Sequence, residues 1–414
     1  MLLRARIVLP ITAPPVEDGA VLISGDRVLA VGRFADLHAQ VAVPVTDLGE
    51  VVVLPGLVNA HCHLDYTHLA GRLVPPRTFP DWIKAILAAK AEWDLAAFSA
   101  SWRAGAQSLL ETGTTTVANI EAMPPLLAEC RAATPLRVYS FLEMTGIRSG
   151  RSPDSILEEA IHTARTLTLG HGGVGLSPHA PYSTTPELMR KAAEAARRKG
   201  WRTTTHVGES AAEFDMFMYR RGSMFDWLES QRPMEDCGFG SPVQHLERCG
   251  ILGSNHLAVH ANYLWRGDAE RLAASGSQVV HCPSSHAYFG HRCFPFDELT
   301  AVGVNIALGT DSLASTRPTR SHPPVLSLLE ELRQLQATNS MMSPQRALEL
   351  ATAHGARALG LAGQAGELRE GSWADVIAIP HSGSIEAAPE AVVHHSGRVT
   401  ASMIAGGWAI PPKE

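Results

Sequence analysis

The chain has 414 residues, of which 45% are apolar and 18% charged, and its formal net charge is −6. This composition is typical of a folded globular protein and excludes wholesale disorder or a collagen-like chain. The acidic balance argues against a nucleic-acid partner, because phosphate binding needs a basic face. No apolar stretch approaches the roughly 18 residues of a membrane span, so we expect no membrane association.

The first ten residues are apolar enough to resemble a secretion signal, but Arg4 and Arg6 interrupt them and no small-residue cleavage site follows. The alternation of these arginines with Ala5 and Ile7 favours a strand. The six cysteines are scattered and form no CxxC pair. We therefore expect no disulfide framework and a cytoplasmic location.

Short strands are predicted at both ends of the chain. Strand-like runs occupy 21–24, 27–31, 375–379 and 397–405. The intervening Gly25-Asp26 suits a type II′ hairpin turn, and Gly406-Gly407 marks another turn. We predict a small β-sandwich domain built from residues 1–54 and 363–414.

Residues 55–362 alternate between strand and helix patterns. Strand-like runs lie near 53–60, 114–119, 136–143, 174–178, 202–206, 256–260, 278–282 and 304–310. Helix-like runs separate them, at 80–93, 97–112, 154–169, 186–199, 265–275 and 324–337, and Thr185 is a suitable N-cap before Pro186. Eight such units predict an α/β fold of the (β/α)8 TIM-barrel type. An open doubly wound sheet is the alternative, but no GxGxxG follows the first strand.

Polar residues recur where these strands end. They are His61, His63, Glu143, His179, His206, His260, His281 and Asp311. Barrel active sites are built at the C-terminal ends of the strands. We therefore expect these side chains to converge on one site.

The first of these positions carries a candidate metal motif. His61 and His63 alternate with Cys62, so both imidazoles face the same side of the strand and can hold one divalent metal. The other interpretation is a pair of hydrogen-bonded histidines in a turn, since HxH alone is a weak pattern. The preceding apolar strand and Pro55-Gly56 favour metal binding.

Three later motifs supply further candidate ligands and an acid. His206 ends a Thr-rich strand, and Glu209 follows on the loop, where a carboxyl suits proton transfer. Alone, Glu209 would be interpreted as a surface residue. His260 and Asp311 each end an apolar strand, and a buried carboxylate such as Asp311 needs a partner, which a metal supplies.

In this order and spacing, these motifs resemble the amidohydrolase superfamily, in its cytosine/adenosine-type deaminase and chlorohydrolase branch. The resemblance runs nearly end to end and includes the return segment 366–375. It implies one zinc or iron(II) held by His61, His63, His206 and Asp311. Two-metal members carry a bridging Lys or Glu after the fourth strand, whereas segment 176–183 has neither.

The same resemblance implies catalytic roles. The metal lowers the pKa of its water, Asp311 takes the water proton and His260 orients the hydroxide. Glu209 protonates a ring nitrogen and then the departing amine. His179 resembles a contact to the substrate ring.

The segment after the seventh strand departs from relatives such as guanine deaminase. His286 stands where those relatives have Asn, and His291 is additional. This variant is more similar to sequences related to aminodeoxyfutalosine deaminase, which implies that His286 binds substrate. Alternatively, both histidines only shape a loop.

We therefore predict a metal-dependent hydrolytic deaminase of an adenosine-type nucleoside: aminodeoxyfutalosine, S-adenosylhomocysteine or methylthioadenosine. The alternatives are the same machinery on a triazine, another C–N or C–Cl bond or an amide, and a barrel that has lost its chemistry. The complete ligand set argues against the last. Such barrels often dimerise, so a homodimer is the assembly considered.

The loop after the third strand carries Arg148 and Arg151 beside glycines, and two arginines there can grip a carboxylate bidentately. The commoner fate of such arginines is a solvated loop. Trp82, after Asp81, is a candidate sugar or ring contact, or else anchors its helix. We accordingly expect a nucleoside with an acidic 5′ substituent.

Overall fold

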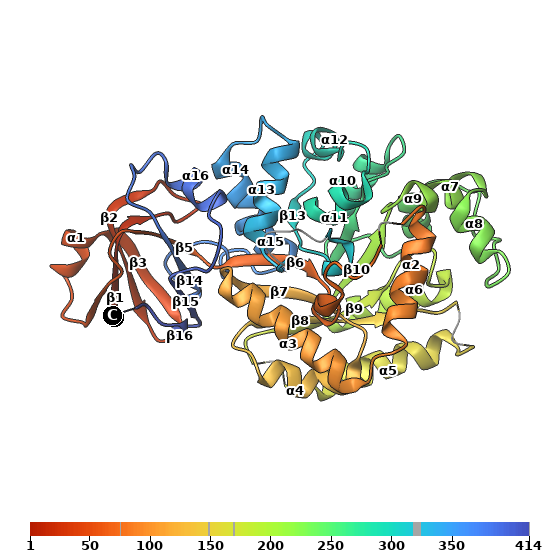
Figure 1. The fold of residues 1–414 in the computed structure, drawn as a ribbon, viewed down its shortest axis with the longest axis horizontal. Coiled ribbons are helices and arrows are strands. Elements are labelled where there is room, and N and C mark those ends of the chain that lie inside the picture. The colour runs from red at the N-terminus through yellow and green to blue at the C-terminus, as the bar shows by residue number, and fades with distance from the viewer. Residues whose placement is uncertain (75, 148–149, 169, 318–323, 414) are drawn as a thin grey trace.

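The computed structural model describes residues 1–74, 76–147, 150–168, 170–317 and 324–413. Its ribbon shows a barrel with surrounding helices beside a smaller sheet, in which the first and last segments of the chain lie together (Figure 1).

The barrel consists of eight parallel strands in chain order. They are β6 (Leu57–Cys62), β7 (Thr114–Glu121), β8 (Arg137–Met144), β9 (Gly173–Pro178), β10 (Arg202–Val207), β11 (His256–His260), β12 (Gln278–His281) and β13 (Ile306–Leu308). Past the end of β13, Asp311 N donates to His61 O at 3.2 Å and His63 N donates to Asp311 O at 3.2 Å. These bonds bring the first and last strands together, and the predicted (β/α)8 barrel is confirmed.

Helices connect and cover these strands. The longer ones are α2 (Phe79–Lys90), α3 (Leu95–Glu111), α5 (Pro153–Thr166), α6 (Pro186–Lys199), α10 (Asp268–Ser275) and α13 (Leu328–Thr338). Each corresponds to a predicted helix, and the Thr185 side chain accepts from Leu188 N at 3.3 Å as the expected N-cap. No described helix is long and apolar enough to cross a membrane.

The sequence did not predict the remaining helices, because five to nine residues show little apolar periodicity. Between β10 and β11 they are α7 (Ala211–Tyr219), α8 (Ser223–Leu228) and α9 (Pro242–Arg248). Elsewhere they are α1 (Phe34–His38), α4 (Leu127–Ala132), α11 (Pro283–Phe289), α12 (Phe296–Ala301), α14 (Pro344–Leu350), α15 (Ala353–Ala358) and α16 (Ala388–Val393), with 3-10 turns at Leu64–Leu69, Pro124–Leu126 and Leu313–Ser315.

The terminal segments form a second sheet, as predicted. Its strands are β1 (Leu2–Val8), β2 (Val16–Ser24), β3 (Arg27–Arg33), β4 (Val45–Asp47), β5 (Val51–Pro55), β14 (Val376–Pro380), β15 (Ala401–Ile404) and β16 (Gly407–Ile410). Hydrogen bonds join these strands into one mixed sheet, in which β5 pairs with β1 on one side and with β14 on the other. The limits at 54/55 and 362/363 stay predictions.

The predicted strand 53–60 is two strands that separate at Gly56. β5 belongs to the terminal sheet and β6 to the barrel. Gly56 N donates to Asp375 O at 3.0 Å, and a Cβ at Gly56 would lie 2.1 Å from Thr115 Oγ1. Only glycine lets the two sheets meet this closely.

Candidate active site

Three histidines and an aspartate from strand ends of the barrel converge in a buried cluster. Asp311 Oδ1 lies 3.6 Å from His61 Nε2 and 3.8 Å from His63 Nε2. The Nε2 atoms of His63 and His206 are 3.3 Å apart. All four residues are at most 5% exposed. The strand ends therefore bring together the four residues expected to bind metal.

The donor atoms of this cluster fit a divalent metal. Both ring nitrogens of His61, His63 Nδ1 and Asp311 Oδ2 are buried and have no hydrogen-bond partner among the described residues. Two imidazole nitrogens bound at roughly 2.0–2.1 Å to one tetrahedral zinc lie roughly 3.3 Å apart, which matches the His63–His206 separation. Buried polar atoms without partners are costly, and a cation at this point would satisfy several together.

Neighbouring groups orient the donors. His206 Nδ1 bonds to the carbonyl oxygen of His179 at 2.8 Å, which leaves Nε2 directed at the cluster. Asn59 links the two strands that carry His61 and Asp311: its Nδ2 donates to Thr310 Oγ1 at 2.8 Å, and its Oδ1 accepts from Thr310 N at 3.2 Å. The donors are thus held by the protein in advance of any ligand.

The backbone is left-handed at two residues of the site. His260 has φ of 73° and Asp311 has φ of 52°. Residues other than glycine adopt such φ angles at a cost of roughly 1–3 kcal/mol, and residues in this conformation cluster at functional sites. The conformation turns each side chain sharply at the end of its strand.

Glu209 lies beside His260. Its Oε1 is 3.6 Å from His260 Nε2, and both side chains are buried. Burial raises the pKa of the Glu209 carboxyl well above its usual range, and the charges of Asp311 and Glu213 add to the increase. Burial lowers the pKa of His260 to about 3. Burial therefore favours the protonated form of the carboxyl and the neutral form of the imidazole.

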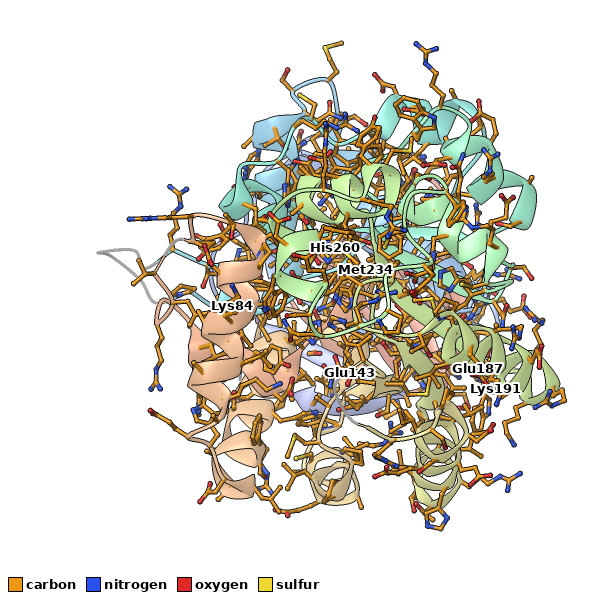
Figure 2. The ribbon with its side chains drawn as sticks, turned by 90° about the vertical axis from the view of Figure 1, so that its right-hand side faces the viewer. Lys84, Glu143, Glu187, Lys191, Met234 and His260 are labelled. Atoms are coloured by element: carbon orange, nitrogen blue, oxygen red, sulfur yellow. The ribbon has the colours of Figure 1, made fainter. Side chains whose placement is uncertain are left out.

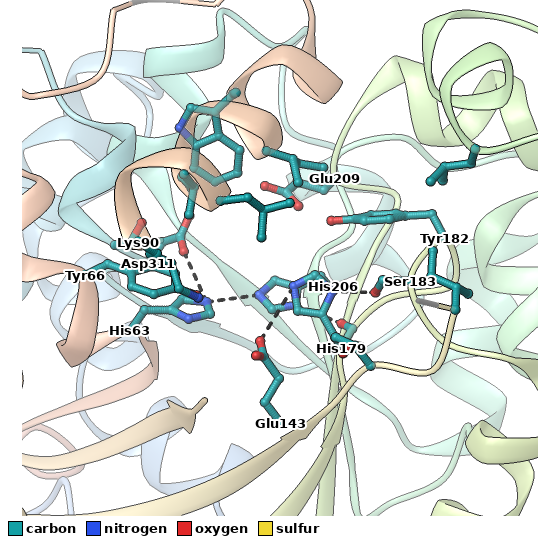
Figure 3. Close-up of a pocket in the computed structure, with 18 of the residues that line it drawn as sticks. His63, Tyr66, Lys90, Glu143, His179, Tyr182, Ser183, His206, Glu209 and Asp311 are labelled. Carbon is teal, nitrogen blue, oxygen red and sulfur yellow. Dashed lines mark hydrogen bonds and ion pairs between the residues drawn. The ribbon is translucent and has the colours of Figure 1, made fainter. Parts of the chain in front are cut away.

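A cavity opens over the cluster (Figure 3). Glu143 and His179 line one wall, with Glu143 Oε1 3.8 Å from His179 Nε2. The Ser183 hydroxyl lies 2.6 Å from His179 Nδ1 and orients that ring. Tyr66 stacks on His63 at a centroid distance of 5.2 Å. The cavity thus joins a candidate metal centre, an acid and ring-binding side chains.

The sequence profile of the amidohydrolase family matches residues 52–409. The chain belongs to this family. A profile of a bacterial imidazolonepropionase-like composite domain also matches residues 19–40.

Two curated relatives of this amidohydrolase are deaminases by name. The 5-methylthioadenosine/S-adenosylhomocysteine deaminase of Syntrophobacter fumaroxidans is 30% identical over 375 residues, covering 88% of this chain and 80% of that protein. The aminodeoxyfutalosine deaminase of Deinococcus radiodurans is 28% identical over 313 residues, covering 72% of this chain and 73% of that protein.

Solved structures share the fold of this amidohydrolase. An adenosine deaminase of Xanthomonas campestris with bound zinc has a TM-score of 0.83 and 24% identity, covering 99% of this chain and 92% of its own. An atrazine chlorohydrolase of Arthrobacter aurescens TC1, complexed with zinc and atraton, has a TM-score of 0.84 and 20% identity, covering 99% of this chain and 95% of its own.

Other residues predicted for the site lie in different places. The Trp82 indole lines the cavity and also packs on Phe289 at 4.9 Å, so it is both a wall and a helix anchor. His286 is absent from the described cavity wall, and its Nδ1 is 3.0 Å from Asn262 Oδ1. The His281 ring stacks on the Phe294 ring at a centroid distance of 3.9 Å and is absent from the described cavity wall. Arg148 lies outside the described residues.

Sequence reasoning missed several residues of the amidohydrolase site. Lys90 lines the cavity from the last turn of α2, and its Nζ donates to the Tyr66 hydroxyl at 2.5 Å. Glu213 and Asn262 hold the loop that carries Glu209. A helix-spaced apolar series ending at Lys90 marks one face of α2, but the sequence does not show that this face lines the cavity, and the bonds of Glu213 and Asn262 depend on loop geometry.

Proposed function

We propose that this amidohydrolase is a metal-dependent hydrolytic deaminase of an adenine nucleoside. The observation that carries the proposal is the position of Glu209, which lies beside His260 and lines the cavity that also exposes His63, His206 and Asp311. Deaminating an adenine ring requires an acid at a ring nitrogen and a nucleophile at the adjacent carbon. The names of the deaminase relatives support the same reaction.

The residues suited to hold a divalent ion are His61, His63, His206 and Asp311. We favour zinc over iron(II), because three imidazoles and one carboxylate form a donor set that suits tetrahedral zinc. When bound, such an ion lowers the pKa of a coordinated water toward neutrality. The cytoplasmic location and the homodimer stay predictions.

Each side chain has a separate task in the proposed reaction. The Glu209 carboxyl keeps its proton near neutral pH and donates it to a ring nitrogen, which makes the neighbouring carbon electrophilic. His260 Nε2 is buried and has no hydrogen-bond partner among the described residues, so it is free to orient the attacking water. Asp311 Oδ2 accepts the first water proton. Glu209, now a carboxylate, takes the second proton from the hydroxyl of the adduct and passes it to the departing amine, and the proton on Asp311 restores the Glu209 carboxyl after ammonia leaves.

The cavity wall favours a substrate with an acidic substituent. Trp82, Ile83, Ile86, Leu87 and Lys90 line the cavity from one face of α2, so an apolar stripe ends in a cation. No described residue forms an ion pair with Lys90. An ammonium in such surroundings favours an anionic partner, which a substrate carboxylate would supply. Arg151, by contrast, pairs with Glu159 at 2.6 Å.

Triazine hydrolysis is the alternative, and the fold does not separate the two, since the chlorohydrolase and the adenosine deaminase match at nearly equal TM-scores. Ammonia release should be measured with adenosine, methylthioadenosine, S-adenosylhomocysteine, aminodeoxyfutalosine, guanine, cytosine and an aminotriazine, and chloride release with a chlorotriazine. We expect turnover of adenine nucleosides, fastest with the two acidic ones. Activity confined to triazines would refute the proposal.

A further inference from the structure

The peptide unit of Glu209 is held from one side by a buried carboxylate. Glu213, on α7, accepts from Gly208 N through Oε1 at 3.1 Å and from Glu209 N through Oε2 at 2.9 Å. Glu213 is fully buried and does not line the cavity among the described residues. Its carboxylate therefore serves the backbone beside the acid rather than the substrate.

The same residue is held from the opposite side by an amide. Asn262 Nδ2 donates to the carbonyl oxygen of Glu209 at 3.0 Å. This orientation directs Asn262 Oδ1 at His286 Nδ1, which lies 3.0 Å away. Because an amide oxygen only accepts, His286 must carry its proton on Nδ1. The histidine on α11 thus fixes the amide that fixes Glu209.

Backbone bonds join the two loops that carry these groups. Tyr263 N donates to Gly208 O at 2.9 Å, and Ala261 N donates to Val207 O at 2.9 Å. Gly208 has φ of 58°, and a Cβ there would lie 2.8 Å from Tyr263 O. The turn leading to Glu209 therefore requires glycine and a close approach of the loop after β11.

We propose that Glu213 and His286 are positioning residues for Glu209, with His286 acting through Asn262. The inference rests on the proposed role of Glu209 as the acid. Bonds to both its N–H and its carbonyl fix the backbone of Glu209, and with it the point from which the carboxyl reaches toward His260. A displacement of about 1 Å in a reacting group can lower the rate roughly 100-fold.

The proposed role of Glu213 can be tested without measuring catalytic activity. Glu213→Gln keeps the side-chain volume but replaces one acceptor with an NH2 group, so hydrogen exchange at Gly208 and Glu209 N–H should become at least several-fold faster. Glu187→Gln, on the periphery of the barrel (Figure 2), is the matched control and should leave that exchange unchanged. Equal hydrogen-exchange rates at Gly208 and Glu209 in the two variants would contradict the proposed role of Glu213.

The His286 arm is tested by kinetics with the best adenine nucleoside of the substrate panel. His286→Ala should lower kcat roughly 10-fold with KM and metal content unchanged, and His286→Asn, which restores a donor near Nδ1, should recover most of it. His291→Ala removes a neighbouring imidazole that bonds to Tyr263 and should have little effect. Similar kcat values for the His286→Ala and His291→Ala variants, or failure of His286→Asn to recover activity, would contradict the inference. A wild-type protein that deaminates no adenine nucleoside would refute the proposed function instead.

Discussion

Buried polar and charged groups have different partners in two regions of the molecule. One region is the candidate metal cluster of His61, His63, His206 and Asp311, and the other is the junction between the barrel and the terminal sheet. At the junction, Arg137 Nη2 donates to both oxygens of Asp375 at 3.0 and 2.9 Å, and the guanidinium lies 3.6 Å from the Trp373 ring centroid. Asp375 Oδ1 also accepts from Ala405 N at 2.8 Å. Both members of this ion pair are almost fully buried.

In the cluster, by contrast, ring nitrogens of His61 and His63 and one oxygen of Asp311 are buried with no hydrogen-bond partner among the described residues. At the junction, the paired charges of Arg137 and Asp375 hold the two sheets together. In the cluster, a bound cation would satisfy the histidine nitrogens and the Asp311 oxygen that lack partners. Arg137 Nε at the junction also lacks a hydrogen-bond partner, but its guanidinium charge is paired with Asp375, whereas the cluster gathers several unpartnered nitrogen and oxygen atoms that one cation could satisfy together.

The largest effect is expected from removing a donor of the cluster. His61→Ala should abolish both metal binding and deamination, because the ion loses one of its four protein donors. Elemental analysis of the wild type should give close to one zinc per chain, and the variant should give much less. The far-ultraviolet spectrum is the control for folding. Two tightly bound metals in the wild type would contradict the single-site assignment.

Glu209→Gln separates the acid from the metal. The amide keeps the shape but cannot supply a proton, so kcat should fall roughly 10²–10⁴-fold while metal content stays at the wild-type level. In the wild type, activity should decline as pH rises through the raised pKa of Glu209, since the protonated form is the active one. Near-normal turnover by the glutamine variant would show that another group is the acid.

Removing the Arg137–Asp375 ion pair should lower the free energy of unfolding and leave catalytic activity unchanged. Arg137→Met leaves the Asp375 carboxylate buried without its charge partner, which typically costs roughly 3–5 kcal/mol of unfolding free energy. Arg103→Met, which breaks the exposed pair with Glu129, should cost less than about 1 kcal/mol. Denaturant unfolding measures both. A small loss in Arg137→Met, or a large loss of kcat in the folded variant, would contradict the division of roles.

Periodicity predicted the barrel and placed candidate metal donors at the strand ends, whereas the full ligand set came from the resemblance to the amidohydrolase superfamily. Apolar runs end in His61, His206, His260 and Asp311, and parallel strands bring such ends to one edge. The same rule included His281, whose ring packs on Phe294 instead of facing the cavity. At the end of β12, packing against Phe294 determines the direction of the His281 side chain, and the strand pattern does not show this.

Residues outside the strand ends were not predictable in this way. Lys90 reaches the cavity only because α2 leans over the site, and an orientation of that kind is not encoded in local pattern. Asn262 and Glu213 act through bonds to a loop whose path depends on Gly208. The break between β5 and β6 was hidden because apolar residues continue on both sides of Gly56.

His256 sharpens the comparison, since it is a buried histidine with a structural role. It bonds to Thr203 Oγ1 at 3.0 Å, and burial lowers its pKa to about 3. An unfolded histidine has a pKa of about 6.5, so its contribution to stability is full above that pH and is lost as pH falls toward 3. Between pH 7 and 5 the loss is roughly 2 kcal/mol. His256→Asn should flatten this decline in denaturant unfolding, whereas the exposed His38→Asn should not.

The smallest effect is expected at Lys90, whose ammonium is the one cation along the described cavity wall. Lys90→Met keeps the apolar length of the side chain and removes the charge, so KM should rise roughly tenfold for S-adenosylhomocysteine or aminodeoxyfutalosine. Methylthioadenosine has no carboxylate and should be little affected. Lys84→Met is the matched control, because Lys84 lies on the same helix with a half-exposed side chain (Figure 2). Equal changes for acidic and neutral nucleosides would mean that Lys90 orders Tyr66 and the cavity wall. A selective change would mean that a substrate carboxylate supplies the ion-pair partner that the Lys90 ammonium lacks among the described residues, just as the proposed metal would satisfy the unpartnered nitrogens of the histidine cluster.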